Sequence, residues 1–276
     1  MKIAFVGKGG SGKSTISWLA IKTLENQGKN VLAIDADHNM DLTGNLNIDP
    51  NQIPMMHRTD KEFMEEIGIS GGMSEILSGK DLPSFSFSPK DKYTESISTD
   101  ISKNISLINI GLGSPDVLYQ GKCAHGLSGP LKYYLGLLDE KDDFVVIDSV
   151  AGVDMINYGL YAGIDAVIGV VEPHRNSVKV FEQIADICRR TMIPYYAVIN
   201  KPNTNIFYEE IKNKFRDKIL GEIPLDDNLM NYDFTKINDD TIKAMENVLE
   251  NISKLNKRSG LSSIKDFQQV KAGNPS

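Results

Sequence analysis

The sequence predicts an α/β protein with a doubly wound, mainly parallel sheet that carries helices on both faces. Three observations lead to this fold class. Short runs rich in Val and Ile alternate with longer amphipathic segments along the 276 residues, as they do when each strand is followed by a crossover helix. Several runs are almost continuously apolar, which is typical of strands covered on both faces. A glycine-rich segment follows the first run and precedes a helix, as in phosphate-binding loops.

The elements can be assigned in order along the chain. An apolar stripe from Ile16 to Leu24 indicates a first helix, which ends at Gly28. The expected strands lie at 3–6, 31–34, 105–110, 144–147, 166–171, 196–199 and 219–223. The later helices are expected at 129–138, 176–191, 207–216 and 239–255.

Residues 50–104 interrupt this alternation. They are rich in Ser, Pro, Gly, Met and charged residues, and they contain no clear strand. We interpret them as a variable helical and loop insertion in a single domain that spans residues 1–256. Residues 257–276 are predicted to be a polar C-terminal tail.

Composition excludes several classes of protein. There are 30 basic and 37 acidic residues, so the net charge of −7 argues against nucleic acid as a partner. No apolar run reaches membrane-spanning length, and no stable membrane anchor is expected. Two cysteines do not make a disulfide framework. Since the first core strand begins within the first few residues, no signal peptide is expected, and the predicted location is the cytoplasm.

The opening segment KIAFVGKGGSGKST matches two phosphate-binding patterns. Three of its glycines fit the G-x-G-x-x-G of dinucleotide-binding proteins, and residues 7–14 fit the G-x-x-x-x-G-K-[ST] of the P-loop. A dinucleotide loop needs no lysine. Here Lys13 supplies a charge for the β- and γ-phosphates, and Ser14 supplies a hydroxyl for Mg²⁺. The sequence therefore predicts binding of a nucleoside triphosphate.

Main-chain N–H groups of such a loop form a nest for anions at the N-terminus of the following helix. The residues expected to hold the phosphates of ATP or ADP are Gly9, Gly10, Ser11, Gly12, Lys13, Ser14 and Thr15.

A second lysine, Lys8, lies inside the loop. The pattern K-G-G-x-G-K-[ST] resembles the deviant Walker A loop of the MinD/ParA/nitrogenase iron protein class of ATPases. This resemblance implies hydrolysis of ATP to ADP and phosphate by a homodimer. Lys8 would cross the dimer interface and reach the phosphates bound to the partner subunit, as an arginine finger does. Lys8 and Lys13 are therefore candidate catalytic residues.

Acidic motifs of that class follow in order. The resemblance implies that Asp37 in AIDADHNMD orients or deprotonates the attacking water, while Asp35 and Asp41 belong to the water shell of Mg²⁺. In FVVIDSVAG, Asp148 would hold Mg²⁺ through water, and Gly152 would approach the γ-phosphate through its main chain.

Two later motifs imply recognition of the base. Asn200 in YAVINKP matches the residue whose amide reads adenine, and Pro224 in GEIPLDD belongs to the loop that closes over the base. The resemblance covers most of the chain and fails only across the insertion and the tail.

Within this class, DAVIGVVEPHRNSVKVFEQI, INKPN and LGEIPLDD look most like the CooC-type maturation ATPases of nickel-dependent carbon monoxide dehydrogenase. Those proteins carry a Cys-x-Cys that binds nickel or zinc between two subunits. Here the matching positions are Cys123 and His125. Two copies would supply a Cys₂His₂ set suited to such a metal ion. Spacing alone favours an unrelated loop cysteine and histidine, whereas the position in the family pattern favours a metal site.

Three functions remain open. The leading hypothesis is an ATPase that drives metal insertion into, or maturation of, a client metalloenzyme such as carbon monoxide dehydrogenase. The second is an electron-transfer ATPase with a bridging iron–sulfur cluster, since CAHGLSG also resembles the CAGRG of the nitrogenase iron protein. That family needs a further cysteine where this chain has Ala151, and Cys188 fits a core position. The third is a metal-free positioning switch of the ParA/MinD type.

Overall fold

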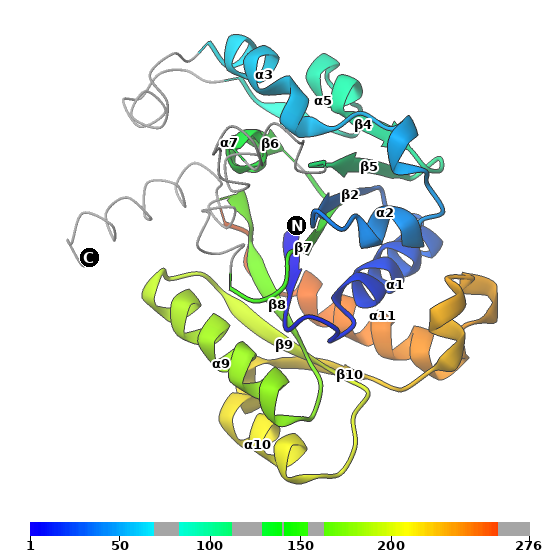
Figure 1. Cartoon of the computed structure of the whole chain (residues 1–276), viewed down its shortest axis with the longest axis vertical. Helices are drawn as coiled ribbons and strands as arrows, with labels where there is room; N and C mark the ends of the chain where they lie inside the picture. The colour runs from blue at the N-terminus through cyan, green and yellow to red at the C-terminus, as the bar shows by residue number, and fades with distance from the viewer. Residues whose placement is uncertain (69–82, 112–128, 140, 154–162, 259–276) are drawn as a thin grey trace.

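A computed structural model describes residues 1–68, 83–111, 129–139, 141–153 and 163–258 (Figure 1). Its main feature is an eight-stranded sheet with the strand order β10-β9-β8-β1-β7-β2-β5-β4. All neighbouring pairs are parallel except β4 and β5. The strands span β1 Lys2–Val6, β2 Val31–Ala36, β4 Ser98–Asp100, β5 Ile105–Asn109, β7 Phe144–Ser149, β8 Ala166–Val171, β9 Tyr195–Asn200 and β10 Ile219–Ile223. The predicted fold class is confirmed.

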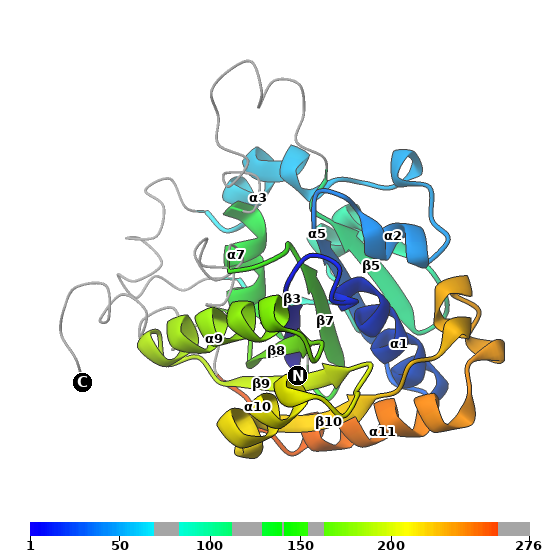
Figure 2. The ribbon, with the colours of Figure 1, turned by 60° about the horizontal axis from the view of Figure 1, so that its bottom comes forward.

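Helices cover both faces of this sheet. One face packs against α1 and α11, and the opposite face packs against α7, α9 and α10 (Figure 2). The helices of the two layers span α1 Lys13–Asn26, α7 Gly129–Leu137, α9 Arg175–Arg190, α10 Ile206–Phe215 and α11 Asp239–Ser253. No helix in the described ranges is long and apolar enough to cross a membrane.

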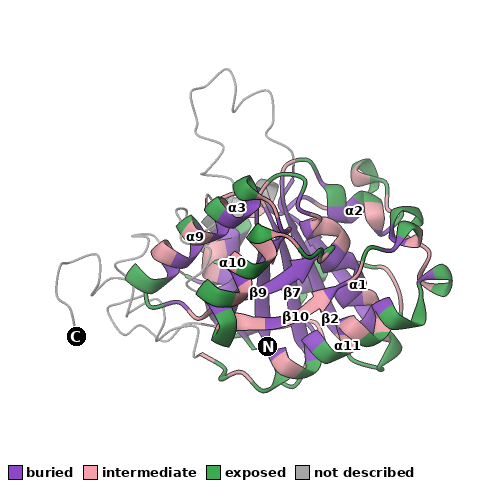
Figure 3. Cartoon of the chain, turned by 90° about the horizontal axis from the view of Figure 1, so that it is seen from below, coloured by how far each residue is buried: buried purple, intermediate pink, exposed green. Residues whose placement is uncertain are grey.

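The continuous apolar character of the strands follows from this double cover. In β1, Ile3 and Phe5 belong to the core beneath α1 and α11, whereas Ala4 and Val6 belong to the core on the other face. All four side chains are fully buried. The strands accordingly form a buried band through the centre of the molecule (Figure 3). The ends of the strands, and not their faces, are therefore left for function.

The insertion differs from the prediction, because residues 50–104 do contain strands. The short strand β3, Phe85–Ser86, pairs with β6, Leu138–Asp139, and β4 extends the main sheet by pairing antiparallel with β5. The expectation of a segment without strands was wrong, since β4 has the sequence Ser-Thr-Asp and gives no apolar signal. An edge strand that pairs on one side only does not need one. The other elements in the described part of this segment are α3 Asp60–Glu66, α5 Lys92–Ile97 and the 3₁₀ turns η1 Pro50–Gln52 and η2 Met56–Thr59.

Candidate functional site

The glycine-rich loop joins the end of β1 to the start of α1. Gly12 has a left-handed conformation with φ 87° and begins α1 without a side-chain cap, so the first turn of the helix keeps its N–H groups for another acceptor. The loop is closed internally by a hydrogen bond from Ser11 N to Lys8 O at 3.0 Å. Gly152 N, beyond β7, donates to Gly7 O at 2.8 Å. The geometry is that of an anion-binding nest.

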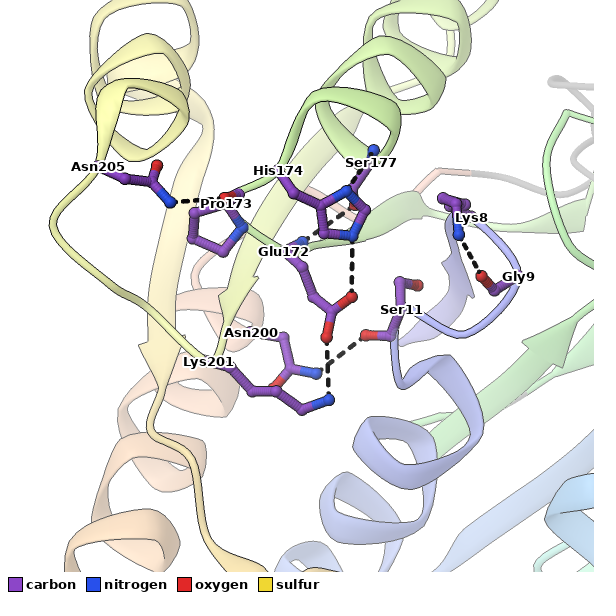
Figure 4. A network of polar contacts seen from close by, with 10 residues as sticks. All are labelled: Lys8, Gly9, Ser11, Glu172, Pro173, His174, Ser177, Asn200, Lys201 and Asn205. Atoms are coloured by element: carbon purple, nitrogen blue, oxygen red, sulfur yellow. Dashed lines mark hydrogen bonds and ion pairs between the residues drawn. The ribbon is translucent and has the colours of Figure 1, made fainter.

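Asn200, at the end of β9, holds this loop from the side. Its Nδ2 donates to the carbonyl of Ser11 at 2.9 Å, and the side chain is almost completely buried (Figure 4). A Cβ atom at Gly12 would lie only 2.5 Å from that nitrogen. Gly12 is therefore required both by its φ angle and by the close approach of Asn200. This contact with the loop was not predicted for Asn200, whose expected role was reading the base.

Two carboxyl groups lie next to the loop at the ends of neighbouring strands. Asp35 of β2 and Asp148 of β7 are register partners, and both side chains have no exposed surface. Burial raises the pKa of Asp148 to about 7, helped by the charge of Asp35, while the Ser14 hydroxyl, Lys13 and Ser17 act in the opposite direction. Since neighbouring buried carboxylates disfavour ionisation, this place favours a bound cation.

The two oxygens of Asp148 have different surroundings. Oδ1 accepts a hydrogen bond from the Ser17 hydroxyl at 3.1 Å, whereas Oδ2 is buried and has no hydrogen-bond partner among the described residues. A buried acceptor without a donor is unfavourable unless another ligand satisfies it. Ser17 lies one turn after Ser14 on α1. Its role was not predicted, because the contact depends on how α1 packs on β7.

Asp35 is bound differently, because its carboxylate organises the next segment of chain. Oδ2 accepts hydrogen bonds from the main-chain N–H of Thr43 at 2.8 Å and from its hydroxyl at 2.7 Å. Oδ1 accepts from Asp37 N at 3.3 Å. Burial raises the pKa of Asp35 to about 6, and the hydrogen bonds from Thr43 oppose that rise. Asp35 thus fixes the turn that carries Asp37.

The two lysines of the loop lie in different environments. Lys13 is buried, and its charge is close enough to lower the pKa of Asp148. Lys8 is partly exposed, and its Nζ donates to the carbonyl of Gly9 at 2.9 Å, so the ammonium rests on its own loop (Figure 4).

Asp37, predicted to act on the attacking water, and Asp41, predicted for the Mg²⁺ shell, have different surroundings. Asp37 is buried, and its Oδ1 accepts from Asn39 N at 3.0 Å. Asp41 is exposed in the first turn of α2, Asp41–Asn45. No group of three or more His, Cys, Asp or Glu in the described part of the chain is arranged to hold a metal ion. Cys123 and His125 lie outside the described residues.

A polar network that the sequence did not suggest links the ends of β8 and β9. The carboxylate of Glu172 accepts from Lys201 Nζ at 2.9 Å and contacts His174 Nε2 at 3.2 Å (Figure 4). Its main-chain N–H donates to the Ser177 hydroxyl at 3.0 Å. Because Lys201 directly follows Asn200, this network holds the chain next to the amide that contacts the loop.

The segment after β10 completes the site on the side of Asn200. Ile223 and Asn200 are register partners, so Pro224 follows at the same edge of the sheet. Asp226 is buried and fixes the segment by accepting from Asn228 N at 3.0 Å and Asn238 N at 2.9 Å. Leu225 projects outward and is 67% exposed.

A glycine nest at a helix N-terminus, a buried lysine and a buried carboxylate on the neighbouring strand define a P-loop nucleotide-binding protein. The sequence profile of the CobQ/CobB/MinD/ParA nucleotide-binding domain matches residues 3–239. The chain therefore belongs to this family and is a P-loop ATPase.

Individual relatives agree with this assignment. The chain is 29% identical over 235 residues to an ATP-binding protein of Methanocaldococcus jannaschii, covering 83% of this chain and 90% of that protein. It is 26% identical over 238 residues to the carbon monoxide dehydrogenase accessory protein CooC of Rhodospirillum rubrum, covering 82% and 84%. A plasmid partition protein of Borrelia burgdorferi bound to AMPPNP superposes with a TM-score of 0.62 at 25% identity, covering 92% and 98%.

Proposed function

We propose that this protein is a dimer-forming, Mg²⁺-dependent ATPase that couples ATP binding and hydrolysis to metal insertion into, or maturation of, a client metalloenzyme. The observation that carries this proposal is the likeness to the accessory protein CooC, which extends over 82% of the chain. By that likeness the client is of the carbon monoxide dehydrogenase type. Nickel is the favoured cargo.

ATP binding uses the loop as the anion site. The N–H groups of the loop and of the first turn of α1 take the α- and β-phosphates, and Lys13 supplies charge for the β- and γ-phosphates. Gly152 is held against the loop by donating its N–H to Gly7 O, so a main-chain contact with the γ-phosphate would require this hydrogen bond to be exchanged. Asn200 and Pro224 lie at adjacent strand ends, where they are proposed to contact adenine.

The residues present fit Mg²⁺. Among the described residues Asp148 Oδ2 is a buried acceptor with no donor, and the Ser14 hydroxyl is close enough to that carboxyl group to lower its pKa. Oxygen donors of this kind suit Mg²⁺, with water completing its shell. When bound, the ion would neutralise charge on the β- and γ-phosphates. Asp35 is proposed to act from the second layer of ligands through Thr43 and Asp37, and Asp41 at most through water.

Hydrolysis is assigned to Asp37. Its carboxylate would orient a water molecule and accept its proton as the oxygen attacks the γ-phosphorus, while the bond to the β-phosphate oxygen breaks and ADP leaves. The Asp37 main chain is held by Asp35, which supports a fixed position for the carboxylate.

Lys8 is proposed to act in the partner subunit. Among the described residues its ammonium makes one hydrogen bond, to a carbonyl of its own loop, and Lys8 is partly exposed. A lysine with so few contacts can be reoriented at little free-energy cost when a second subunit closes over the site. The positive charge would then reach the transferring phosphoryl group only in the dimer.

The transition-metal site is proposed at the twofold axis. Cys123 and His125 from each of two subunits would form one four-coordinate set for nickel or zinc. The position of the two residues in the family motif supports this assignment.

A second candidate function is a nucleotide-dependent positioning switch without a transition metal. The likeness to the plasmid partition protein, which covers 92% of this chain, favours it. The negative net charge of this chain counts against a DNA partner. A bridging iron–sulfur cluster is the weakest alternative, since Ala151 stands where a second cysteine is needed.

Metal analysis and a visible spectrum of anaerobically purified full-length protein separate these functions. The metal-insertion proposal predicts about half an equivalent of nickel or zinc per chain, with ATP hydrolysis that requires Mg²⁺. A brown protein with iron and sulfide would indicate the cluster. A colourless, metal-free ATPase that takes up neither nickel nor zinc would favour the positioning switch.

A further inference from the structure

Tyr232 joins two parts of the nucleotide site that are far apart in the sequence. Its hydroxyl lies 3.2 Å from the hydroxyl of Thr15, the third residue of α1. Tyr232 directly follows the 3₁₀ turn η6, Asp227–Asn231, which lies on the segment that begins at Pro224. In Figure 2 this segment runs past α1 before it returns as α11.

The main chain of Tyr232 has an unusual conformation. With φ 49° and ψ 34° it lies in the left-handed region, which a bulky aromatic residue rarely adopts. Strained residues of this kind persist where the surroundings determine them, and they are concentrated at functional sites. The conformation directs the side chain toward α1 and its hydroxyl toward Thr15.

Several contacts hold Tyr232 in this position. Its N–H donates to the carbonyl of Leu229 at 3.3 Å, and its ring meets the buried ring of Trp18 edge-on, with the centroids 5.4 Å apart. Asp226 fixes the start of the segment through its two main-chain hydrogen bonds. Hydrogen bonds from the main chain of Asn238 and Asn228 hold the pKa of Asp226 below its usual range, although burial alone would raise it. The carboxylate therefore remains ionised and keeps the segment in place.

We propose that Tyr232 is a positioning residue that couples the base-contacting segment to the phosphate-binding turn. The inference rests on the proposed nucleotide site, where Pro224 contacts the base and Thr15 the phosphates. A complete nucleoside triphosphate occupies both parts, so its binding depends on their relative position. Inorganic tripolyphosphate occupies only the phosphate part, so its binding does not.

The test is Tyr232→Phe, which removes the hydroxyl and keeps the ring against Trp18. Calorimetric titrations should show that ATP binds about 3- to 10-fold more weakly, a loss typical of one hydrogen bond, while tripolyphosphate binds as before. The KM for ATP should rise by the same factor with kcat unchanged. Tyr208→Phe is the matched control. Tyr208, on α10, donates its hydroxyl to Glu222 of β10 at 3.0 Å, and its loss should leave both affinities unaltered.

A double-mutant cycle with Thr15→Val completes the test. In the Thr15→Val background, Tyr232→Phe should have no further effect on ATP affinity, because the same hydrogen bond is already absent. If Tyr232→Phe does not fold, Thr15→Val alone should weaken the binding of ATP more than the binding of tripolyphosphate. Wild-type ATP affinity in Tyr232→Phe, equal losses for ATP and tripolyphosphate, or additive effects in the cycle would overturn the inference. Failure of the wild-type protein to bind ATP would instead overturn the nucleotide site itself.

Discussion

Asp35 and Asp148 lie side by side at the carboxyl ends of β2 and β7, as register partners with no exposed surface. Burial raises the pKa of both groups, to about 6 for Asp35 and about 7 for Asp148. Asp35 nevertheless receives hydrogen bonds from Thr43, whereas Oδ2 of Asp148 has no donor within the described part of the chain. Asp35 therefore holds the neighbouring chain in place, whereas Asp148 has one oxygen available to a ligand.

The first prediction concerns pH and Asp148. Its pKa in the folded protein is above the unfolded value of 3.8, so the folded state binds more protons and the free energy of unfolding falls as pH rises from about 4 to about 7. Asp148→Asn should remove this pH-dependent contribution to the free energy of unfolding. In the absence of Mg²⁺ and nucleotide, urea titrations should show the variant more stable than wild type by on the order of 1–3 kcal/mol at pH 8, with a smaller difference near pH 4.

The same pKa predicts how Mg²⁺ and ATP act. Because the ion needs the carboxylate form, the Mg²⁺-dependent part of ATP affinity should rise with pH and level off above about 7. Asp148→Asn should lose that part. Asp217→Asn, at an exposed position of the 3₁₀ turn η5, Arg216–Lys218, is the matched control and should change neither quantity. A stability difference that does not vary with pH would contradict the assignment to Asp148.

The sequence predicts the fold because the apolar patterns that mark its strands and helices lie within short stretches of the chain. Strands covered on both faces must be apolar, and the predicted strand at 166–171 coincides with β8. In contrast, β4 is a three-residue polar edge strand whose existence depends on the neighbouring β5. No periodicity within three residues can reveal such a strand.

The residues of the candidate site also differ in whether the local sequence can reveal them. The loop is a continuous motif, so its glycines and Lys13 could be found from spacing alone. Ser17, Thr43 and Tyr232 act through partners 131, 8 and 217 positions away. Their hydroxyls are common in helices and turns, and only the packing of α1, α2 and η6 brings them to Asp148, Asp35 and the loop. Tyr232 carries no sequence signal for its left-handed main chain, since glycine or asparagine is the usual residue there.

The second prediction concerns Asp37. Asp37→Asn should lower steady-state ATP hydrolysis by at least about 10²-fold, because the amide cannot accept the proton of the attacking water. ATP affinity should be retained, since Asp37 is proposed to contact water and not the phosphates. Lys13→Ala should instead weaken ATP binding itself. Hydrolysis close to wild type in Asp37→Asn would remove this residue from the catalytic step.

The third prediction concerns Lys8 acting across the dimer. Lys8→Ala should bind ATP in each subunit and lose hydrolysis by about 10³-fold or more, as when an arginine finger is removed. Mixing this variant with Asp37→Asn should restore hydrolysis. In the heterodimer, the site on the Lys8→Ala chain keeps its own Asp37 and receives Lys8 from the partner chain. Heterodimers that form without regaining activity would show that Lys8 acts in its own subunit.

The fourth prediction separates strain from contact in the loop. Gly10 and Gly12 have similar φ angles of 82° and 87°, but a Cβ at Gly10 has no neighbour within 4 Å, whereas one at Gly12 would meet Asn200. Gly10→Ala should therefore lower the free energy of unfolding only by the strain of a left-handed alanine, about 1–2 kcal/mol. Gly12→Ala should lose more stability and most ATP affinity. Adding Asn200→Ala to Gly12→Ala should recover stability without recovering ATP affinity. Equal effects of Gly10→Ala and Gly12→Ala would show that the contact with Asn200 is unimportant.

The last prediction concerns the proposed metal ion between subunits. Cys123 and His125 offer two donors per chain, too few for a closed tetrahedral site, and a symmetric dimer supplies the missing pair. Binding of nickel or zinc should be steeply pH-dependent, because thiolate and neutral imidazole are the competent forms. The proposed subunit closure, which would bring Lys8 to the partner's phosphates, would also change the separation of the two proposed metal-binding segments. ATP should therefore change metal affinity, and metal should change ATP affinity by the same factor. Cys123→Ala should abolish metal binding and metal-linked dimerisation in calorimetry and light scattering, while each subunit still binds ATP; Cys188→Ala, at a buried position of α9, should retain the metal. If wild-type protein takes up neither metal in micromolar titrations with or without ATP, the metal-insertion function is wrong and the ATPase remains.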